Sequence, residues 1–368
     1  MFGKGDEQIN FQEIVEKSYL EMGNVNIVIA GKTGVGKSTL VNAVFGENLA
    51  KTGKGQPVSQ TTKEYKSDNM RGLTLFDTKG FELGKYREIL SDLKNFISSR
   101  KTVNPNDHIH VCWYCINDFG NRYEKEEINF IQELQSEIPV IVVFTQAISN
   151  DEFYKKCCQD HYSVIHNSVR VLAERYVMGN GLAMEPYGTV DLVKKTKELL
   201  PECAVQTFVS VQKVDKTLKR NQVSTIIKVA AAGAIAAGAS PIPFSDAFVL
   251  APIQIIMMAK ISSTMGLNLN SGFLSTLVGS TAGVTGATAG GRVIVSTLLK
   301  MMPGAGSVIG GAISAAIAGT LTTTMGWAYY KAIDAIFTKG IKPENVSPED
   351  LANIFKDNLR KGDNNESE

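Results

Sequence analysis

Short apolar runs alternate with amphipathic segments over the first 200 residues of the chain. Runs of strand length stand at 25–30, 73–76, 109–116, 140–144 and 169–172. Segments with apolar residues at helical spacing stand at 37–45, 86–99, 124–134 and 190–200. Strands that alternate with helices build a parallel sheet with helices on both faces, so the pattern predicts an α/β domain with a mostly parallel sheet.

The segments on either side of this pattern differ from it. Phe11, Ile14, Val15 and Tyr19 recur at helical spacing and predict a short amphipathic helix, which we expect to pack on the domain that follows. The α/β pattern itself stops near residue 200. We therefore predict an N-terminal helix (1–22), an α/β domain (23–202), an all-α hydrophobic helical domain (203–340) and a polar C-terminal tail (341–368), read as a surface helix with a frayed end.

Charge is distributed unevenly between the two halves. A quarter of residues 1–222 are charged, whereas residues 223–338 carry only seven charges, on Lys228, Asp246, Lys260, Arg292, Lys300, Lys331 and Asp334. Uncharged runs at 261–291 and 301–330 are long enough to cross a bilayer at about 1.5 Å per residue. The second run is only moderately hydrophobic, so its length alone does not assign it to a membrane.

The run at 301–330 has a ridge of large residues beside a stripe of small ones. The ridge is Ile309, Ile313, Ile317, Leu321 and Met325, and the stripe is Gly311, Ala315 and Gly319. Small-residue stripes let helix backbones approach closely, both in membranes and in tight soluble bundles. We expect helical hairpins that pack around one another or open into lipid.

Net charge excludes some partners. The chain has 38 basic and 37 acidic side chains, which gives no basic field for nucleic acid, so no nucleic-acid partner is expected. The N-terminal residues lack the apolar core of a secretory signal. We expect a cytoplasmic protein, alone or at the cytoplasmic face of a membrane.

The first apolar run leads directly into GKTGVGKST. This segment satisfies GxxxxGK[ST] with Gly31, Gly36, Lys37 and Ser38. Glycines let successive backbone N–H groups face a phosphate, the following helix adds its positive end, and Lys37 reaches the β- and γ-phosphates. We expect the nucleotide to be bound here by Gly31, Thr33, Gly34, Val35, Gly36, Lys37, Ser38 and Thr39.

A second phosphate motif follows forty residues later. Asp77 and Gly80 form a DxxG at the end of LTLFDTKG, where the aspartate holds a magnesium-bound water and the glycine amide meets the γ-phosphate. The polar stretch before it contains Thr61 and Thr62, and we favour Thr62 as a mobile switch residue whose hydroxyl joins the metal. The predicted Mg²⁺ residues are Ser38, Thr62 and Asp77, and the predicted catalytic residues are Lys37, Thr62 and Gly80.

With these motifs the chain resembles the Era-like and septin-like GTPases of the TRAFAC class, and GKTGVGKS is similar to the septin-type loop. The resemblance implies GTP and GDP as ligands. It places the [NT]KxD motif, whose Asp pairs with guanine, at Thr145, Gln146 and Ile148, so Thr is kept while Lys and Asp are replaced. Asp151 or a backbone contact is the alternative reader of the base. Ala173 matches the small residue whose amide meets the guanine carbonyl.

Two further departures bear on hydrolysis. Phe81 stands where Ras-like relatives place a water-orienting Gln, and Gly34 stands where potassium-activated relatives place an Asn. Slow hydrolysis is therefore expected, with faster turnover supplied by a partner, by dimerisation or by backbone positioning.

The segments 239–267 and 298–330 resemble a hydrophobic helical domain of unknown function that follows Era-like GTPase domains in many bacteria. We predict a GTPase switch whose helical domain engages a membrane lipid or self-assembles, as a homodimer or oligomer, according to nucleotide. The alternative is a soluble regulatory NTPase whose helical bundle binds a partner. A ribosome-assembly factor lacks support because no basic RNA-binding appendage is present.

Overall fold

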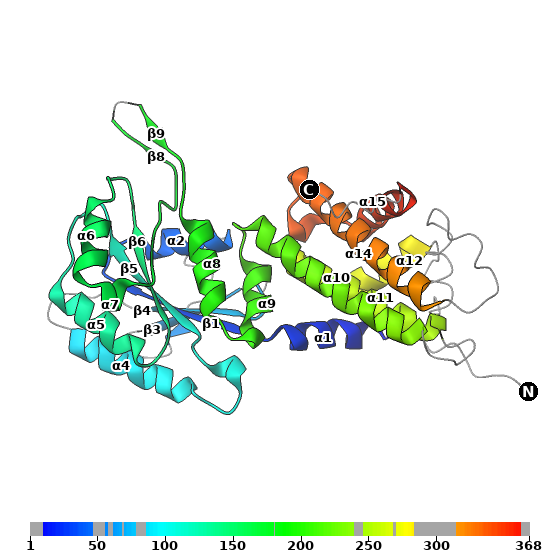
Figure 1. The fold of residues 1–368 in the computed structure, drawn as a ribbon, viewed down its shortest axis with the longest axis horizontal. Helices are drawn as coiled ribbons and strands as arrows, with labels where there is room; N and C mark the ends of the chain where they lie inside the picture. Colours follow the sequence, from blue (N-terminus) through cyan, green and yellow to red (C-terminus); the bar gives the residue numbers. More distant parts are fainter. Residues whose placement is uncertain are drawn as a thin grey trace, which may run out of the picture. The chain divides into compact units, whose positions relative to one another are not determined.

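The computed structural model describes residues 10–46, 56–57, 62–67, 70–78, 86–179, 181–238, 246–267, 270–282 and 314–361. They form two compact units (Figure 1). The sheet unit runs from Met22 to Lys216. The helical unit takes its described residues from Met1–Glu21 and Thr217–Glu368.

The sheet unit contains a seven-stranded sheet with the order β2-β3-β4-β1-β5-β6-β7. Strands β4, β1, β5, β6 and β7 are parallel, and β2 and β3 are antiparallel to their neighbours. The predicted α/β class with a mostly parallel sheet is confirmed. The strands are β1 (Val25–Gly31), β2 (Gln56–Pro57), β3 (Thr62–Lys66), β4 (Leu73–Thr78), β5 (Val111–Asn117), β6 (Val140–Thr145) and β7 (Ser168–Arg170).

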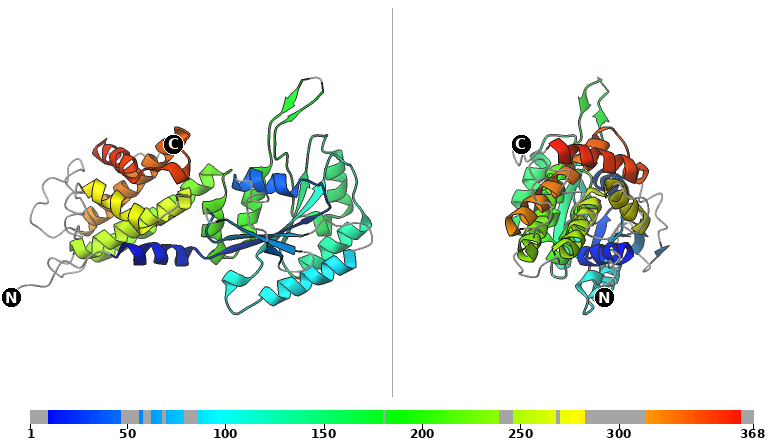
Figure 2. Two further views of the ribbon diagram at one scale, coloured as in Figure 1. Left: turned by 180° about the vertical axis from the view of Figure 1, so that it is seen from behind. Right: turned by 90° about the vertical axis from the view of Figure 1, so that its right-hand side faces the viewer.

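Helices cover both faces of this sheet (Figure 2). One face carries α2 (Lys37–Phe45), α8 (Thr189–Leu199) and α9 (Glu202–Val211), and the other carries α4 (Tyr86–Arg100), α5 (Lys125–Gln135), α6 (Glu152–Asp160) and α7 (Tyr162–Ile165). Alternation along β5 serves both faces, since Trp113 stacks on Phe45 of α2 while Tyr114 packs against Phe130 of α5. A short hairpin, β8 (Tyr176–Val177) and β9 (Ala183–Met184), projects from the unit (Figure 1).

The sheet unit extends beyond the boundary predicted at residue 202. Helix α9 packs on β1 and β4, with Phe208 and Val209 fully buried. The N–H of Lys213 then donates to the carbonyl of Val44 near the end of α2, at 2.8 Å. The unit therefore closes at Lys216, because the apolar face of α9 completes its core.

The helical unit is a bundle of helices (Figure 2). It has a large hydrophobic core and a smaller buried cluster of Ala234, Leu250, Ala251 and Ala318. A buried Leu, Ile, Met and Tyr set fills the space between the helices, and Ser262 and Tyr329 share a hydrogen bond of 2.5 Å inside it. The helices are α1 (Phe11–Met22), α10 (Lys216–Gly238), α11 (Asp246–Met265), α12 (Ser271–Ala282), α14 (Ala315–Thr338) and α15 (Pro348–Lys361).

Both ends of the described chain contribute to this core, which corrects two expectations. Val15 of α1 is buried in the helical unit, with Ile14 packed against the same core, and not on the α/β domain. The segment 341–368, predicted as a surface helix with a frayed end, contains the helix α15, but its Leu351, Phe355 and Leu359 are fully buried. Their four-residue spacing gives the helix one apolar stripe, which packs on α12 and α14.

The predicted ridge and stripe are described in part. Leu321 and Met325 of the ridge are buried in the core, while Ile309, Ile313 and Gly311 lie outside the described residues. The stripe packs closely: a Cβ on Gly238 of α10 would lie 3.0 Å from the Cα of Ala315, and one on Gly319 would lie 2.7 Å from Cγ1 of Ile235. Within the described ranges, no helix combines the length and the apolarity that crossing a bilayer requires.

Candidate functional site

The loop that joins β1 to α2 is shaped by glycine. Gly31 has φ +136° and Gly36 has φ +92°, which residues with a side chain rarely adopt. A Cβ on Gly31 would also collide with the backbone carbonyl of Cys115 in β5. The loop therefore curls tightly at the end of β1, and α2 begins directly after it at Lys37.

The side chain of Lys37 folds back across this loop. Its Nζ donates to the carbonyls of Gly31 and Lys32, both at 2.9 Å. An ammonium group has three N–H donors, so these two bonds leave one for a ligand. The N-terminus of α2 adds backbone N–H groups and the positive end of the helix dipole, which together favour an anion.

An open cavity of about 480 Å³ lies against the loop. Its lining combines the loop and the start of α2 with residues from β3, β4 and the end of β6. The lining residues are Thr33, Gly34, Gly36, Lys37, Ser38, Thr39, Lys63, Tyr65, Asp77, Thr78 and Gln146. A polar cavity of this size, with backbone amides and ammonium groups in its wall, suits a phosphorylated small molecule.

Asp77 is the carboxylate of this cavity. It lies on β4, in register with Ile29 of β1, and is half-buried. Burial raises the pKa of Asp77, and the charges of Lys37 and Lys63 oppose that rise. Its Oδ1 is buried and has no hydrogen-bond partner among the described residues. A buried carboxylate oxygen without a donor, facing the same cavity as the Ser38 hydroxyl, fits a divalent cation such as Mg²⁺.

Thr145 and Gln146 hold the loop from the end of β6. The Thr145 hydroxyl lies 2.5 Å from the carbonyl of Val35, and Gln146 Nε2 donates to the carbonyl of Gly34 at 3.0 Å. Asn117 in turn donates to Oε1 of Gln146 at 3.2 Å. Gln146 has φ +52°, which turns the chain sharply where the strand ends.

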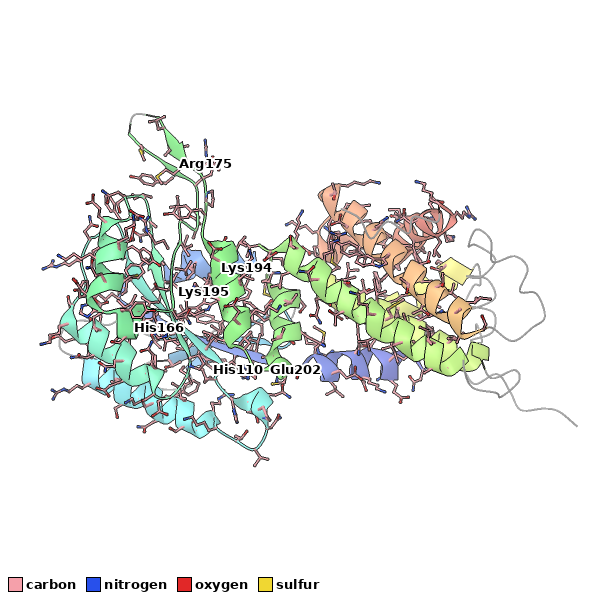
Figure 3. All side chains as sticks on the ribbon, in the orientation of Figure 1. His110, His166, Arg175, Lys194, Lys195 and Glu202 are labelled. Carbon is pink, nitrogen blue, oxygen red and sulfur yellow. The ribbon has the colours of Figure 1, made fainter. Side chains whose placement is uncertain are left out.

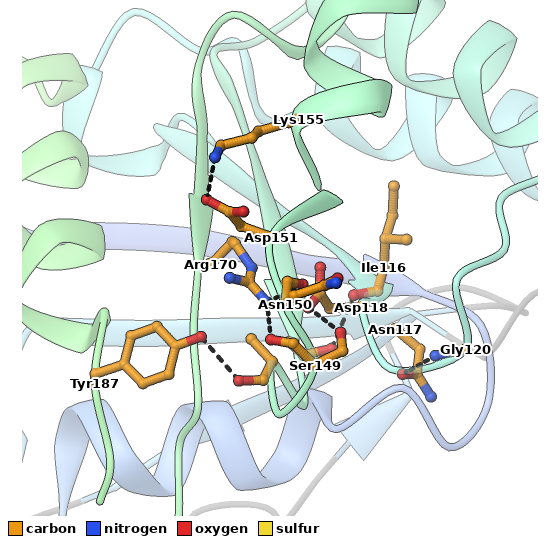
Figure 4. Close-up of polar contacts among 12 residues, drawn as sticks. Ile116, Asn117, Asp118, Gly120, Ser149, Asn150, Asp151, Lys155, Arg170 and Tyr187 are labelled. Carbon is orange, nitrogen blue, oxygen red and sulfur yellow. Dashed lines mark hydrogen bonds and ion pairs between the residues drawn. The ribbon is translucent and has the colours of Figure 1, made fainter. Parts of the chain in front are cut away.

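The corner beyond Gln146 is where the resemblance places the base. Ile148 stands at the position of the base-reading carboxylate, and the two aspartates of this corner are both in ion pairs (Figure 4). Asp118 is fully buried and bonds Arg170 at 2.6 Å. Asp151 bonds Lys155 at 2.8 Å, and its side chain points toward that lysine.

The same arginine fixes the backbone of the corner. Nη2 of Arg170 donates to the carbonyls of Ser149 and Asn150, both at 3.0 Å. From the other side, the Tyr187 hydroxyl donates to the carbonyl of Ala147 at 2.8 Å (Figure 4). The loop after β6 is therefore held by side chains from β7 and from the segment before α8.

Most of the predicted nucleotide residues lie together. Thr33, Gly34, Gly36, Lys37, Ser38, Thr39, Asp77 and Gln146 line the cavity. Gly31, Val35 and Thr145 shape or hold the loop without being among the lining residues. Ala173 is not among the described residues that line the cavity. It directly follows Leu172, which forms a β-bridge with Tyr187. Thr61, Gly80 and Phe81 lie outside the described residues.

The structure does not bring Thr62 to the cavity. Thr62 opens β3, pairs with Thr78 of β4 and is 1% exposed, so in this structure it is part of the sheet. Strand alternation instead places its neighbour Lys63, and then Tyr65, on the cavity side. Sequence reasoning missed these two residues. The alternation of charged and aromatic positions in TKEYK was the available signal.

Two family models match the chain, one in each half. Residues 26–146 match a family described as a 50S ribosome-binding GTPase, and residues 208–348 match a domain of unknown function, DUF697. These matches confirm the predicted GTPase domain and the fused helical domain.

Septins are among the similar curated proteins. Septin-8 of Xenopus tropicalis is 27% identical over 182 residues, which cover 43% of this chain and 43% of the septin. Septin-1 of Drosophila melanogaster is 22% identical over 228 residues, covering 54% of this chain and 62% of that protein. The chain thus spans less than two thirds of these relatives.

Solved structures show a weak overall likeness. A probable GTP-binding protein engB is 19% identical, with a TM-score of 0.33, and the alignment covers 48% of this chain and 98% of that one. A TM-score this low adds nothing to the assignment.

The strand, the glycine-shaped loop and the helix, with Lys37 inside the loop and Asp77 across the cavity, define a P-loop nucleotide-binding protein. The family matches then specify the class. The chain is a P-loop GTPase with an additional C-terminal domain.

Proposed function

We propose that this protein is a GTP-dependent molecular switch with slow intrinsic hydrolysis. The observation that carries the proposal is the shared cavity in which Lys37, Ser38 and Asp77 face one another from the loop and β4. GTP binding and GTP hydrolysis in general follow from membership of the GTPase class. We further propose that the metal is Mg²⁺, that intrinsic hydrolysis is slow and that the nucleotide state controls the helical unit.

Mg²⁺ is the metal we propose. Ser38 offers a hydroxyl oxygen and Asp77 a carboxylate oxygen, and such hard oxygen donors suit this ion. When bound, Mg²⁺ neutralises charge on the phosphate oxygens. Ser38→Ala should weaken Mg²⁺-dependent GTP binding while leaving metal-free GDP binding within about threefold, as measured by calorimetry with and without the metal.

The proposed rate is on the order of 10⁻³ per second or below without a partner, by comparison with switch GTPases that lack a catalytic arginine. Phe81 has no polar group to orient water. Phosphate release should be measured across a range of protein concentrations. A monomeric protein that turns over many GTP per second contradicts the slow rate, and a rate that climbs with concentration supports activation by dimerisation. Phe81→Ala should change the rate little.

The helical unit is the proposed output. Our first proposal is that nucleotide state controls its engagement of a membrane surface or its self-assembly, on the cytoplasmic side of the cell. The alternative is a bundle that binds a protein partner, and one observation favours it: Leu321 and Met325 of the apolar ridge are buried inside the unit's own core.

Vesicle flotation and sedimentation velocity separate these outputs. The intact protein is tested with GTP, with GDP and without nucleotide, using vesicles of mixed zwitterionic and anionic lipids. Flotation or assembly that depends on nucleotide supports the first proposal. A monomer that ignores vesicles in all three states supports the alternative.

A further inference from the structure

Two side chains of β3 face the cavity that the phosphate motifs build. Strand β3 pairs antiparallel with β4, and Lys63 lies directly opposite Asp77 in the register. Side chains alternate along a strand, so Lys63 and Tyr65 share one face, and both line the cavity. The pKa of Tyr65 is raised by burial and by the Asp77 carboxylate, as expected for groups on one wall.

The other charged residues of β3 are engaged with one another. Glu64 forms ion pairs with Lys66, at 2.8 Å, and with Arg100 of α4, at 3.8 Å. Arg100 lies over the ring of Phe76, 5.1 Å from its centre. Glu64 thus contacts α4 through Arg100, whereas the neighbouring Lys63 lines the cavity.

Three charged side chains line this cavity. Its charged lining residues are Lys37, Lys63 and Asp77, which stand at the loop and on β3 and β4. A triphosphate is most negative at its terminal group. A terminal phosphate that Lys37 contacts from the loop would therefore also lie near the β3–β4 wall, where Lys63 supplies a second cation.

We propose that Lys63 binds the terminal phosphate of the nucleotide and thereby makes the site prefer a triphosphate to a diphosphate. This inference rests on the proposed function, because it assumes that GTP occupies the cavity. Lys63 is the cation that the β3 wall supplies at the position where GTP and GDP differ.

A second role for Lys63 predicts different behaviour. If Lys63 only balanced the charge of Asp77, its loss would affect GTP and GDP equally, since Asp77 faces the cavity with either ligand. The ratio of the two affinities is therefore the informative quantity. A non-hydrolysable GTP analogue keeps the terminal phosphate in place during the measurement.

The test compares Lys63→Gln with the intact wild-type chain by calorimetry, in Mg²⁺, with the GTP analogue and with GDP. Affinity for the GTP analogue should fall by about ten- to hundredfold, as for loss of a charge-assisted hydrogen bond, while affinity for GDP stays within about threefold. Lys63→Arg should restore part of the loss. Lys66→Gln, on the same strand and with a 65% exposed side chain, is the matched control and should change neither.

A measurement on the unaltered protein provides a second arm. Acylation of lysines by a water-soluble active ester, read by mass spectrometry, should modify Lys63 with GDP bound and spare it with the GTP analogue, while Lys66 reacts equally in both. Equal loss of both nucleotides in Lys63→Gln, or equal labelling of Lys63 in both states, overturns the inference. Failure of the wild type to bind either nucleotide instead overturns the proposed function.

Discussion

Arg170 and Asp118 form an ion pair, with 2.6 Å between Nη2 and Oδ2, at the carboxyl ends of two parallel strands of the sheet. The Asp118 side chain is 0% exposed and that of Arg170 is 15% exposed. The pair closes the corner next to the nucleotide cavity, and Arg170 also anchors the backbone of Ser149 and Asn150. The Asp118 carboxylate is thereby held in a structural ion pair and is not available to a purine base.

Removing the arginine should be costly. Arg170→Met leaves Asp118 buried without its counterion, which lowers the free energy of unfolding by about 3–5 kcal/mol. Arg175→Met is the matched control. Arg175, labelled in Figure 3, pairs with Glu185 on the surface, and the two side chains are 60% and 73% exposed. Its effect should stay below about 1 kcal/mol in the same urea titration. Equal effects of the two variants would contradict a structural role for the buried pair.

Asp77→Asn should separate stability from function. Burial raises the pKa of Asp77 against the opposing charges of Lys37 and Lys63, so the folded state holds a proton there more tightly than the unfolded state. The ionised carboxylate thus costs stability above the raised pKa, and this cost fades as the pH falls through that pKa toward 3.8.

In the absence of nucleotide, Asp77→Asn should therefore melt at a higher temperature than the wild type near pH 7.5. The gain should shrink at acidic pH, while Mg²⁺-dependent binding of GTP is lost. Melting curves at several pH values check the first point, and calorimetry checks the second. A variant that melts lower than the wild type near neutral pH would contradict the role of burial.

The residue at position 148 should determine how strongly the site prefers guanine to other purine bases. Ile148 has no carboxylate, and the two nearby aspartates, Asp118 and Asp151, are both in ion pairs, so we expect no carboxylate of the described corner to accept from the 2-amino group of guanine. ITP has the base carbonyl of GTP but lacks its 2-amino group. The wild type should therefore bind GTP and ITP with affinities within about threefold of each other. ATP should bind more weakly, because adenine lacks the carbonyl that guanine and hypoxanthine share.

Ile148→Asp should then favour GTP over ITP by about tenfold or more, because the new carboxylate accepts from the 2-amino group. Ile148→Asn is the control for size and shape and should shift the ratio less. Competition against a fluorescent GDP analogue measures all three proteins. A wild type that already prefers GTP to ITP by about thirtyfold would show that another group reads the base.

The close packing of α14 on α10 should be sensitive to a larger side chain at position 315. Ala315 of α14 faces Gly238 of α10, where a Cβ on the glycine would lie 3.0 Å from the Ala315 Cα. Ala315→Leu should destabilise this unit by about 1–3 kcal/mol, as overpacking does. Ala316→Leu, at the neighbouring exposed position, should change stability by less than about 0.5 kcal/mol. Fluorescence of Trp327, which lies on α14, follows the transition.

Much of the sheet unit could be predicted because its central parallel strands, β1, β5 and β6, are buried on both faces and read as apolar runs. The run predicted at 140–144 matches β6 (Val140–Thr145), and the helix predicted at 37–45 matches α2 (Lys37–Phe45). The phosphate loop carries its own signature in glycine spacing, so its residues were predictable one by one. These features depend on local sequence alone.

Features that depend on distant partners were not predictable in the same way. β3 is short and carries alternating charges, so TKEYK looks like a polar loop until β4 pairs with it and turns Lys63 toward the cavity. α15 has a charged composition. Its apolar stripe is recognisable as part of a core only once the packing on α12 and α14 is known; the stripe is Leu351, Phe355 and Leu359. The domain boundary was misplaced because α9 joins the sheet unit through side chains such as Phe208.

Helix α2 has a different neighbour at each end. Its first residue is Lys37 in the phosphate loop, and near its last turn the carbonyl of Val44 accepts the N–H of Lys213. A nine-residue helix is too stiff to absorb movement along its axis, so a piston-like shift of the loop cannot occur without moving or breaking the bond to Lys213. Lys213 is followed three residues later by Lys216, where α10 begins. The segment that leads from the sheet unit into α10 is thus hydrogen-bonded to the end of α2 that lies opposite the phosphate loop.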